Sequence, residues 1–541
     1  MKKCTAAAFL FIIATCGYSQ SPLQRPRLVV GIVVDQMRWD YLYRYHSRYA
    51  ANGGFKRLMN KGFNCNNTQI PFTPTYTACG HAAIYTGSVP AINGITGNNW
   101  YDNEKQQFVY CTSDSMVSPV GSANAAAGKM SPVNLFTTTI CDELKLTTNF
   151  KSKVVGISLK DRGGILAAGH SADAAYWYDS STGEWITSTY YMKALPNWVN
   201  EFNKKKWVDQ YYLKGWNTLY PVNTYTQSTA DENNYEVKTM GKNFPYNLSS
   251  FAGKNYNLIL GTPYGNTLTT QFCKAAIDKE QLGSDSITDF LAISYSSTDY
   301  IGHSYGPNSI EIEDTYLRLD QELAELLDYL DARVGKDQYL LFLSADHGAA
   351  HNPRFMKDNK LPAGNVDALK LEAALNLALK AKFGADELVI GIINFQVVLN
   401  LPVIEANAKL KSDEITAWII KYLSKLEAVS QVFALEDLET TVLNSTVKNR
   451  IANGYFKKRS GQIQMVYKPQ WLEGFENGGT THGLWNPYDA HIPLIFYGWN
   501  IQPGSANREM YMTDIAPTLA ALLKIQVPNG SIGKSITEIT R

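Results

Sequence analysis

Motifs that combine aspartate with histidine occur at separate places along this chain of 541 residues. Carboxylate and neutral imidazole suit zinc, and a catalytic zinc keeps three protein ligands and one open position. Three aspartates and three histidines are enough for two such sets, and two metal ions about 4 Å apart can stabilise both the attacking and the leaving oxygen in phosphoryl transfer. The six residues are Asp35, Asp299, His303, Asp346, His347 and His482.

Each of these motifs, taken alone, is more often structural than functional, because short motifs give many false positives. Their positions make them more specific. Asp35, Asp299 and Asp346 each end an apolar run, and His482 precedes a fourth run. Since ligands of open α/β sheets bind beyond the carboxyl ends of the strands, these motifs can converge although they lie far apart in the chain.

A candidate nucleophile is Thr77, in a segment that follows a polar loop and leads into a predicted helix. A hydroxyl at the start of a helix and beside a metal ion can ionise near neutral pH, and the backbone amides there favour an anion. Threonine is also a common helix cap, and the local sequence alone favours that simpler role. His81 is expected to order this segment rather than to bind metal.

Lys160 and Arg162 offer positive charge for a phosphate group. They follow a predicted strand over residues 154–159, and residues two apart on an extended chain point to the same side. We therefore expect both side chains to face one way and Asp161 the other. The alternative is a solvated charge pair beside a strand, because Lys and Arg are usually exposed.

Four β-rich apolar runs predict the strands that position these residues, at 27–35, 290–299, 338–346 and 491–498. Nearly continuous apolar sequence is typical of strands buried on both faces of a parallel sheet. Residues 310–334 have helical spacing, so the second and third strands are joined by a helix, as in the crossover of an α/β fold. A further amphipathic helix is expected over 512–525.

Two insertions are expected in a catalytic domain that spans residues 21–541. Residues about 170–285 are rich in Tyr, Trp, Asn and Thr and predict an irregular cap. Its tryptophans are expected to make a local core rather than a substrate platform. Residues about 355–475 alternate helical and strand-like patterns, which is typical of a small α+β subdomain.

The first 20 residues are interpreted as a secretory signal peptide, since two lysines precede a short apolar run and small residues follow it. The alternative is a lipid anchor on Cys16, although Thr15 fits a lipoprotein signal poorly. Either form predicts export to the periplasm or the extracellular space. Five cysteines follow this segment, and their odd number leaves at least one without a disulfide partner.

The charge composition gives no support for binding to nucleic acid or to an anionic membrane. The formal net charge is +1 at pH 7, so no bias of charge favours nucleic acid or an anionic membrane. No stretch after the first 20 residues is long and apolar enough for a transmembrane segment. Nothing in the sequence predicts an oligomeric state.

The segment TACGHA at residues 77–82, together with the six candidate ligands, resembles the metal-and-nucleophile pattern of the alkaline phosphatase superfamily. The segments VVGIVVDQMRWDYL, TGSVPAINGITGNNWYD, SKVVGISLKDRGGIL, SSTDYIGHSYGPNS, FLSADHGAAH and MTDIAPTLAALLKI resemble the phosphate-irrepressible (PafA-type) alkaline phosphatases more closely. The likeness covers nearly all of the mature chain. It implies an α/β fold, an alkaline-phosphatase-like three-layer sandwich around a mostly parallel sheet with cap insertions.

The resemblance also implies the roles of single residues. Thr77 is expected to attack phosphate monoesters and to form a phosphothreonine intermediate. Asn98, with its neighbour Asn99 as the alternative, is expected to contact phosphate, and Lys160 and Arg162 to complete the phosphate site. Two zinc ions per chain are expected, one on Asp299, His303 and His482, and the other on Asp35, Asp346, His347 and Thr77.

Three alternatives share parts of this pattern. A phosphodiesterase or phosphonate hydrolase would have the same zinc core, but Lys160 and Arg162 argue against it because a diester carries less charge. The Cys-x-Pro-x-Arg signature of sulfatases is absent at Cys79. A binding protein without turnover would need to have lost at least one ligand, and none is missing, so measured zinc content would distinguish it.

Overall fold

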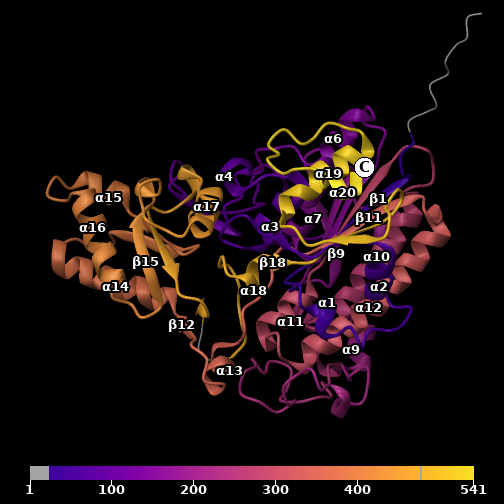
Figure 1. Cartoon of the computed structure of the whole chain (residues 1–541), viewed down its shortest axis with the longest axis horizontal. Helices are drawn as coiled ribbons and strands as arrows, with labels where there is room; N and C mark the ends of the chain where they lie inside the picture. Colours follow the sequence, from indigo (N-terminus) through magenta and orange to yellow (C-terminus); the bar gives the residue numbers. More distant parts are fainter. Residues whose placement is uncertain (1–23, 475–477, 541) are drawn as a thin grey trace, which may run out of the picture.

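A ten-stranded sheet forms the centre of the larger part of the molecule, with the strand order β20-β2-β19-β11-β1-β10-β7-β8-β9-β6. Its outer strands include β20 (Gly504–Ala506), β2 (Phe63–Cys65) and β6 (Pro119–Val120). This is a computed structural model that describes residues 24–474 and 478–540 (Figure 1). Five adjacent strands run parallel: β11 (Tyr339–Ser344), β1 (Leu28–Val34), β10 (Asp289–Tyr295), β7 (Val154–Ser158) and β8 (Ala174–Asp179). The predicted signal peptide, residues 1–20, and Cys16 lie outside the described residues.

The parallel strands β1, β10 and β11 confirm three of the four predicted strands, and every residue in them is buried. The fourth prediction, over 491–498, is wrong in two respects. Pro493 divides the run, so that β18 (His491–Ile492) pairs with β3 (Thr68–Gln69) in a separate sheet. The remainder, β19 (Leu494–Gly498), is antiparallel to β11. Its apolar sequence reflects burial, which an antiparallel neighbour also provides.

Helices cover both faces of the sheet, which gives the three layers of the expected α/β fold (Figure 1). The predicted crossover helix is α12, which runs over Ile310–Leu330, and the predicted C-terminal helix is α19, over Ile515–Leu523. One layer contains α3 (Thr77–Thr86), α6 (Ile140–Thr147), α7 (Asp161–Ala168) and α19, and the other contains α2 (Gly54–Lys61), α10 (Tyr264–Lys279) and α12.

The range 170–285 contributes to the central sheet as well as to the surface. Strands β8 and β9 (Glu184–Ser188) extend the sheet, while α8 (Asn197–Lys204), α9 (Trp207–Lys214) and short 3₁₀ turns lie outside it. Trp177, Trp185 and Trp216 are buried. These three side chains confirm that the aromatic residues of this range form core. The division of the chain into one domain with two insertions stays a prediction.

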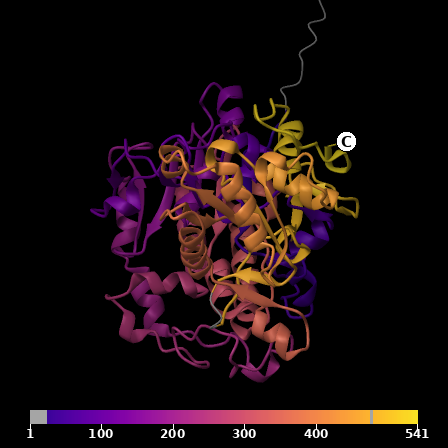
Figure 2. The same ribbon diagram turned by 90° about the vertical axis from the view of Figure 1, so that its left-hand side faces the viewer.

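The range 355–475 contains a separate antiparallel sheet with its own apolar core. Its strands are β13 (Val389–Ile393), β14 (Gln396–Leu399), β16 (Ile463–Tyr467) and β15 (Val429–Ala434), and its longer helices are α14 (Ala368–Phe383) and α16 (Ser412–Leu423). This small unit, drawn in orange, projects to one side of the main sheet in Figure 1 and faces the viewer in Figure 2.

The cysteines in the described residues are free thiols and all are buried: Cys65, Cys79, Cys111, Cys141 and Cys273. None of the helices in residues 24–474 and 478–540 is both long and apolar enough to cross a bilayer.

Candidate active site

The six predicted ligands lie at one edge of the central sheet, as the strand-end argument requires. Asp35 directly follows β1, and Asp346 and His347 come shortly after β11. The predicted strand over 290–299 ends early, at Tyr295, and its last residues begin helix α11 (Ser297–Tyr305). Asp299 and His303 are therefore one helical turn apart on one face of α11, where residues at i and i+4 are neighbours.

The ligands form two adjacent sets. In the first, His347 Nε2 lies 3.4 Å from Asp35 Oδ1 and 3.5 Å from Asp346 Oδ2. In the second, Asp299 Oδ1 lies 3.2 Å from His303 Nε2 and 3.6 Å from His482 Nε2. The rings of His347 and His482 stack with centroids 3.5 Å apart, so the two sets adjoin. Ligand atoms of His347 are also within 4.8 Å of those of Asp299 and His482, so His347 is in reach of both sets.

The three histidines are held in the tautomer that a metal requires. Nδ1 of His303 lies 2.9 Å from the carbonyl of Thr480, and Nδ1 of His482 lies 2.7 Å from the carbonyl of Thr75. Nδ1 of His347 lies 3.0 Å from the carbonyl of Gly348. Because a carbonyl only accepts, Nδ1 must carry the proton in each case, which leaves the Nε2 lone pair directed at the carboxylates.

The carboxylates also fit a bound cation. Asp35 Oδ1 and Asp346 Oδ2 are buried and have no hydrogen-bond partner within the protein. Burial, and then the charges of Asp299 and Asp346, raise the pKa of Asp35 well above its usual value. Both causes, the loss of hydration on burial and the repulsion by the two carboxylates, disfavour a charged Asp35, and a bound cation would offset them. Burial also lowers the pKa of His347 and His482, so both imidazoles are neutral, which is the form that binds metal.

Thr77 is the first residue of α3, and its Oγ1 lies 3.4 Å from His347 Nε2. The hydroxyl therefore adjoins the set that contains Asp35 and Asp346. His81, one turn later in α3, lies with Nδ1 2.9 Å from the carbonyl of Thr77 and Nε2 3.0 Å from a serine hydroxyl of β10. These contacts agree with an ordering role for His81.

Close packing holds α3 against the metal ligands. A Cβ atom added to Gly80 would lie 2.4 Å from the carbonyl oxygen of Asp346, so only glycine lets the helix approach that loop. Asn98 Oδ1 accepts a hydrogen bond of 3.0 Å from the backbone N–H of Ala78 and thus lies beside Thr77, the candidate nucleophile. Asn99 is exposed at the start of β4 (Asn99–Asp102). The geometry favours Asn98 over Asn99.

The local argument for Lys160 and Arg162 is wrong, although both side chains point inward. Helix α7 begins at Asp161, so the alternation of an extended chain does not apply to Arg162. Lys160 Nζ lies 2.6 Å from Asp35 Oδ2 and 2.5 Å from Asp299 Oδ2. Arg162 Nη1 donates a hydrogen bond of 3.1 Å to the hydroxyl of Tyr110. Lys160 is only 4% exposed, which excludes a solvated pair.

The comparisons agree with this arrangement. Residues 29–489 match the family described as type I phosphodiesterase / nucleotide pyrophosphatase. The chain is 51% identical over 520 residues to alkaline phosphatase PafA of Elizabethkingia meningoseptica, covering 95% of this chain and 94% of that protein. It is 56% identical over 523 residues to a Myroides odoratus protein named a calcium-transporting ATPase, covering 95% of both. A crystal structure of wild-type PafA superposes with a TM-score of 0.94 at 50% identity, covering 96% of this chain and 100% of that one.

The chain belongs to the PafA-type alkaline phosphatases. Membership in this family makes it a phosphoric monoester hydrolase and confirms the resemblance inferred from the motifs. Murine ectonucleotide pyrophosphatase/phosphodiesterase 5 superposes with a TM-score of 0.51 at 13% identity over 95% of this chain and 98% of its own, which shows a shared fold alone.

Gln36 is a residue of this phosphatase site that the sequence argument missed. Its Nε2 donates a hydrogen bond of 2.7 Å to Asp299 Oδ1, and its backbone N–H donates one of 3.1 Å to Asp346 Oδ1. A left-handed backbone conformation, with φ of 63°, turns the chain sharply after Asp35. Gln36 therefore orients a carboxylate of each ligand set, and its place directly after Asp35 was the one available signal.

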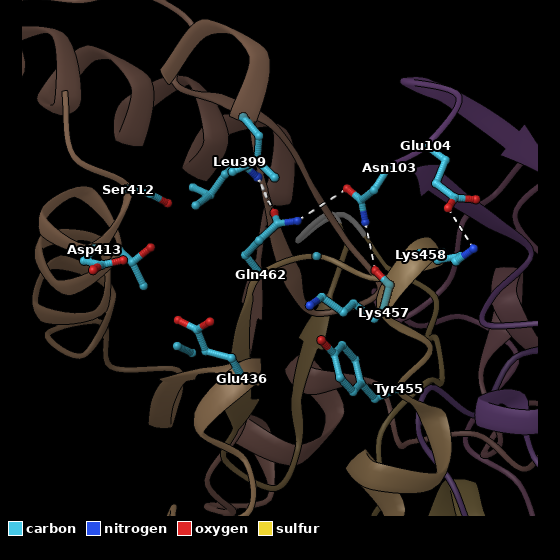
Figure 3. Close-up of a pocket in the computed structure, with 14 residues that line it drawn as sticks. Asn103, Glu104, Leu399, Ser412, Asp413, Glu436, Tyr455, Lys457, Lys458 and Gln462 are labelled. Atoms are coloured by element: carbon cyan, nitrogen blue, oxygen red, sulfur yellow. Dashed lines mark hydrogen bonds and ion pairs between the residues drawn. The ribbon is translucent and has the colours of Figure 1, made fainter. Parts of the chain in front are cut away.

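A cavity of about 490 Å³ lies away from the phosphatase site, between the small unit and the loop joining β4 to β5 (Gln107–Tyr110) (Figure 3). There Asn103 Nδ2 donates a hydrogen bond of 2.8 Å to the carbonyl of Ser460, and Lys458 Nζ lies 2.7 Å from Glu104 Oε1. None of the residues that line it is a candidate ligand. The two contacts join the small unit to the catalytic core.

Proposed function

We propose that this alkaline phosphatase hydrolyses phosphate monoesters at a two-zinc site, with Thr77 as the nucleophile and a phosphothreonine intermediate. The observation that carries the proposal is the position of Thr77 Oγ1, 3.4 Å from His347 Nε2 and next to the buried Asp35–Asp346 pair. A hydroxyl at a helix start, beside unpartnered buried carboxylate oxygens, is placed for activation by a cation.

The donor set supports zinc as the metal. Half of the six side chains are imidazoles, whereas Mg²⁺ and Ca²⁺ take mainly oxygen ligands. We assign one ion to Asp299, His303 and His482, and the other to the remaining ligands, Asp35, Asp346, His347 and Thr77. Zinc held in these positions would supply Lewis acidity, lowering the pKa of the Thr77 hydroxyl and stabilising negative charge on the leaving oxygen.

The reaction consists of two in-line displacements at phosphorus. Thr77 Oγ, after losing its proton to solvent, forms a bond to phosphorus while the bond to the leaving alkoxide breaks, and the alkoxide takes up a proton from solvent. Water then attacks phosphorus from the side that the alkoxide left, and the bond to Thr77 breaks to release inorganic phosphate. The non-bridging oxygens are bound by Lys160, which is located between the two ligand sets, by Arg162 and by the amide of Asn98. The positive charges of Lys160 and Arg162 stabilise the transition state electrostatically.

A substituted form of PafA supports the choice of these four residues. One solved structure of PafA carries substitutions of a threonine, an asparagine, a lysine and an arginine. Those residues follow one another at separations of 21, 62 and 2 positions, which are also the separations of Thr77, Asn98, Lys160 and Arg162. Its structure covers 96% of this chain with a TM-score of 0.93. The matching separations support Asn98 rather than Asn99 as the phosphate contact.

The rival function is hydrolysis of phosphodiesters or phosphonates at the same metals. Hydrolysis of p-nitrophenyl phosphate and of bis-p-nitrophenyl phosphate by zinc-loaded protein distinguishes the two. We expect strong preference for the monoester, lost in Thr77→Ala and in chelated protein, and about two zinc ions per chain by metal analysis. Preference for the diester would overturn the roles of Lys160 and Arg162, and undiminished activity of Thr77→Ala would overturn the nucleophile.

Export is also proposed, on the basis of residues 1–20. Cell fractionation is expected to recover phosphatase activity in the periplasm or the medium. Deletion of residues 2–20 should retain the activity in the cytoplasm. Recovery of the deleted form outside the cytoplasm would contradict the assignment.

A further inference from the structure

The ligand set that lacks Thr77 lies on the open side of the site. The His303 side chain is 36% exposed, whereas those of Asp299 and His482 are each 5% exposed and those of Asp35 and His347 are fully buried. In an in-line displacement the leaving oxygen lies opposite the attacking one. If Thr77 attacks as proposed above, the leaving group therefore faces the His303 set and extends toward solvent past His303.

A cavity of about 440 Å³ adjoins His303 on this open side. Its walls are fixed to helix α11, which carries His303: the N–H of Thr480 donates a hydrogen bond of 3.0 Å to the carbonyl of His303, and the N–H of Val237 donates one of 2.7 Å to the carbonyl of Ser304. A third wall is the parallel pair β12 (Gly364–Val366) and β17 (Trp471–Glu473). Backbone hydrogen bonds and strand pairing therefore fix the walls of the cavity next to the catalytic centre.

Among the described residues that line this cavity, charge comes from one carboxylate. Glu473 is the only acidic residue of that part of the lining, and none of it is Lys or Arg. Glu473 makes no ion pair with any cationic side chain in residues 24–474 and 478–540. Burial, and then the charge of Glu473, raise the pKa of Tyr76.

We propose that Glu473 makes this enzyme select phosphate monoesters whose leaving alcohol carries an ammonium group, as in amino-alcohol phosphates. A cationic group in the cavity would pair with a carboxylate that makes no ion pair within the part of the chain that the structure describes. An anionic leaving group would meet like charge in a cavity without Lys or Arg to offset it. Neutral alcohols would be intermediate.

The test compares choline phosphate with 3,3-dimethylbutyl phosphate, a neutral substrate of the same shape. Assays run at about pH 9, where the Glu473 carboxyl, whose pKa burial raises to about 7, is ionised. The quantity measured is the ratio of the two kcat/KM values. Differences in leaving-group reactivity cancel when that ratio is compared between wild type and variant.

We expect Glu473→Gln to lower the ratio about fivefold, the order that one charge contributes in a partly exposed site. Glu473→Asp should keep most of the preference. Glu436→Gln is the matched control, because Glu436 is exposed and lines the other cavity, and it should leave the ratio unchanged. If Glu473→Gln leaves the ratio unchanged, which includes an equal fall in kcat/KM for both substrates, the role of Glu473 would be overturned. Failure of the wild type to hydrolyse either substrate or p-nitrophenyl phosphate would instead overturn the proposed function, and this inference with it.

Discussion

Replacing Lys160 by methionine would leave two buried carboxylates without their cation. Lys160 Nζ lies 2.6 Å from Asp35 Oδ2 and 2.5 Å from Asp299 Oδ2, and the three side chains are 2%, 0% and 5% exposed. Burial alone would lower the pKa of Lys160, but the charges of Asp299 and Asp35 outweigh it and raise the pKa above its usual value. Lys160 is therefore charged and is the nearest compensation for these two ligands.

Removing one partner from a buried ion pair costs about 3–5 kcal/mol, because the other charge remains buried. We expect a cost of this order in chelated Lys160→Met. Each kcal/mol shifts Tm by about 2–4 °C in a domain of 150–250 residues and by less in a longer chain, so the expected fall is roughly 5 °C. With zinc bound, the metal charge compensates the carboxylates, and the fall should be much smaller.

The assay is thermal unfolding of wild type and Lys160→Met, each with chelator and with zinc. The decisive quantity is the difference between the two falls in Tm. Binding of inorganic phosphate supplies the second readout, because the zinc-loaded variant should bind it more weakly than the wild type does. Equal falls in Tm under both conditions would refute the reasoning, since Lys160 would then stabilise the fold without regard to the metal ligands.

Three further predictions concern single residues. Asn98→Ala should lower kcat/KM for p-nitrophenyl phosphate about tenfold or more, whereas Asn99→Ala should change it by less than about twofold; similar losses in both would contradict the assignment. Gly80→Ala should reduce zinc content and activity together, because its Cβ would lie 2.4 Å from the carbonyl oxygen of Asp346, and full activity would show that α3 can move away. Burial, and then a neighbouring carboxylate, raise the pKa of Glu311 to about 8 from a usual value of 4.5, so its stabilising contribution is present below about pH 4.5 and is lost as pH rises toward 8. Glu311→Gln should therefore have a higher Tm than wild type above about pH 8 and no such advantage near pH 5, and a parallel pH dependence of Tm in the two proteins would contradict this.

The strand-end motifs were predictable because burial and chemistry leave separate marks in the sequence. A continuous apolar run marks a central strand, and Asp35 or Asp346 interrupts it where the strand leaves the sheet. The same mark cannot give strand direction, because β19 is buried over Leu494–Tyr497 and is nevertheless antiparallel to β11. It also cannot show that Asp299 and His303 belong to a helix, since the short polar segment after Tyr295 fits the end of a strand as well as the start of a helix.

Residues that act through shape were harder to predict. Gln36 depends on a left-handed backbone turn, and Lys160, whose side chain reaches Asp35 and Asp299, lies at the N-cap of α7. Glu473 carries no motif, and its place beside the site follows from the pairing of β17 with β12. Such positions are set by tertiary packing, which single-sequence patterns of hydrophobicity do not contain.

The central claim is that the Thr77 hydroxyl takes the phosphoryl group before water does. The most direct measurement is the stereochemistry at phosphorus, when a monoester made chiral with oxygen isotopes is turned over in the presence of an alcohol acceptor. Two displacements, first by Thr77 and then by the acceptor, predict overall retention of configuration. Inversion would mean one direct displacement without a phosphothreonine and would contradict the mechanism.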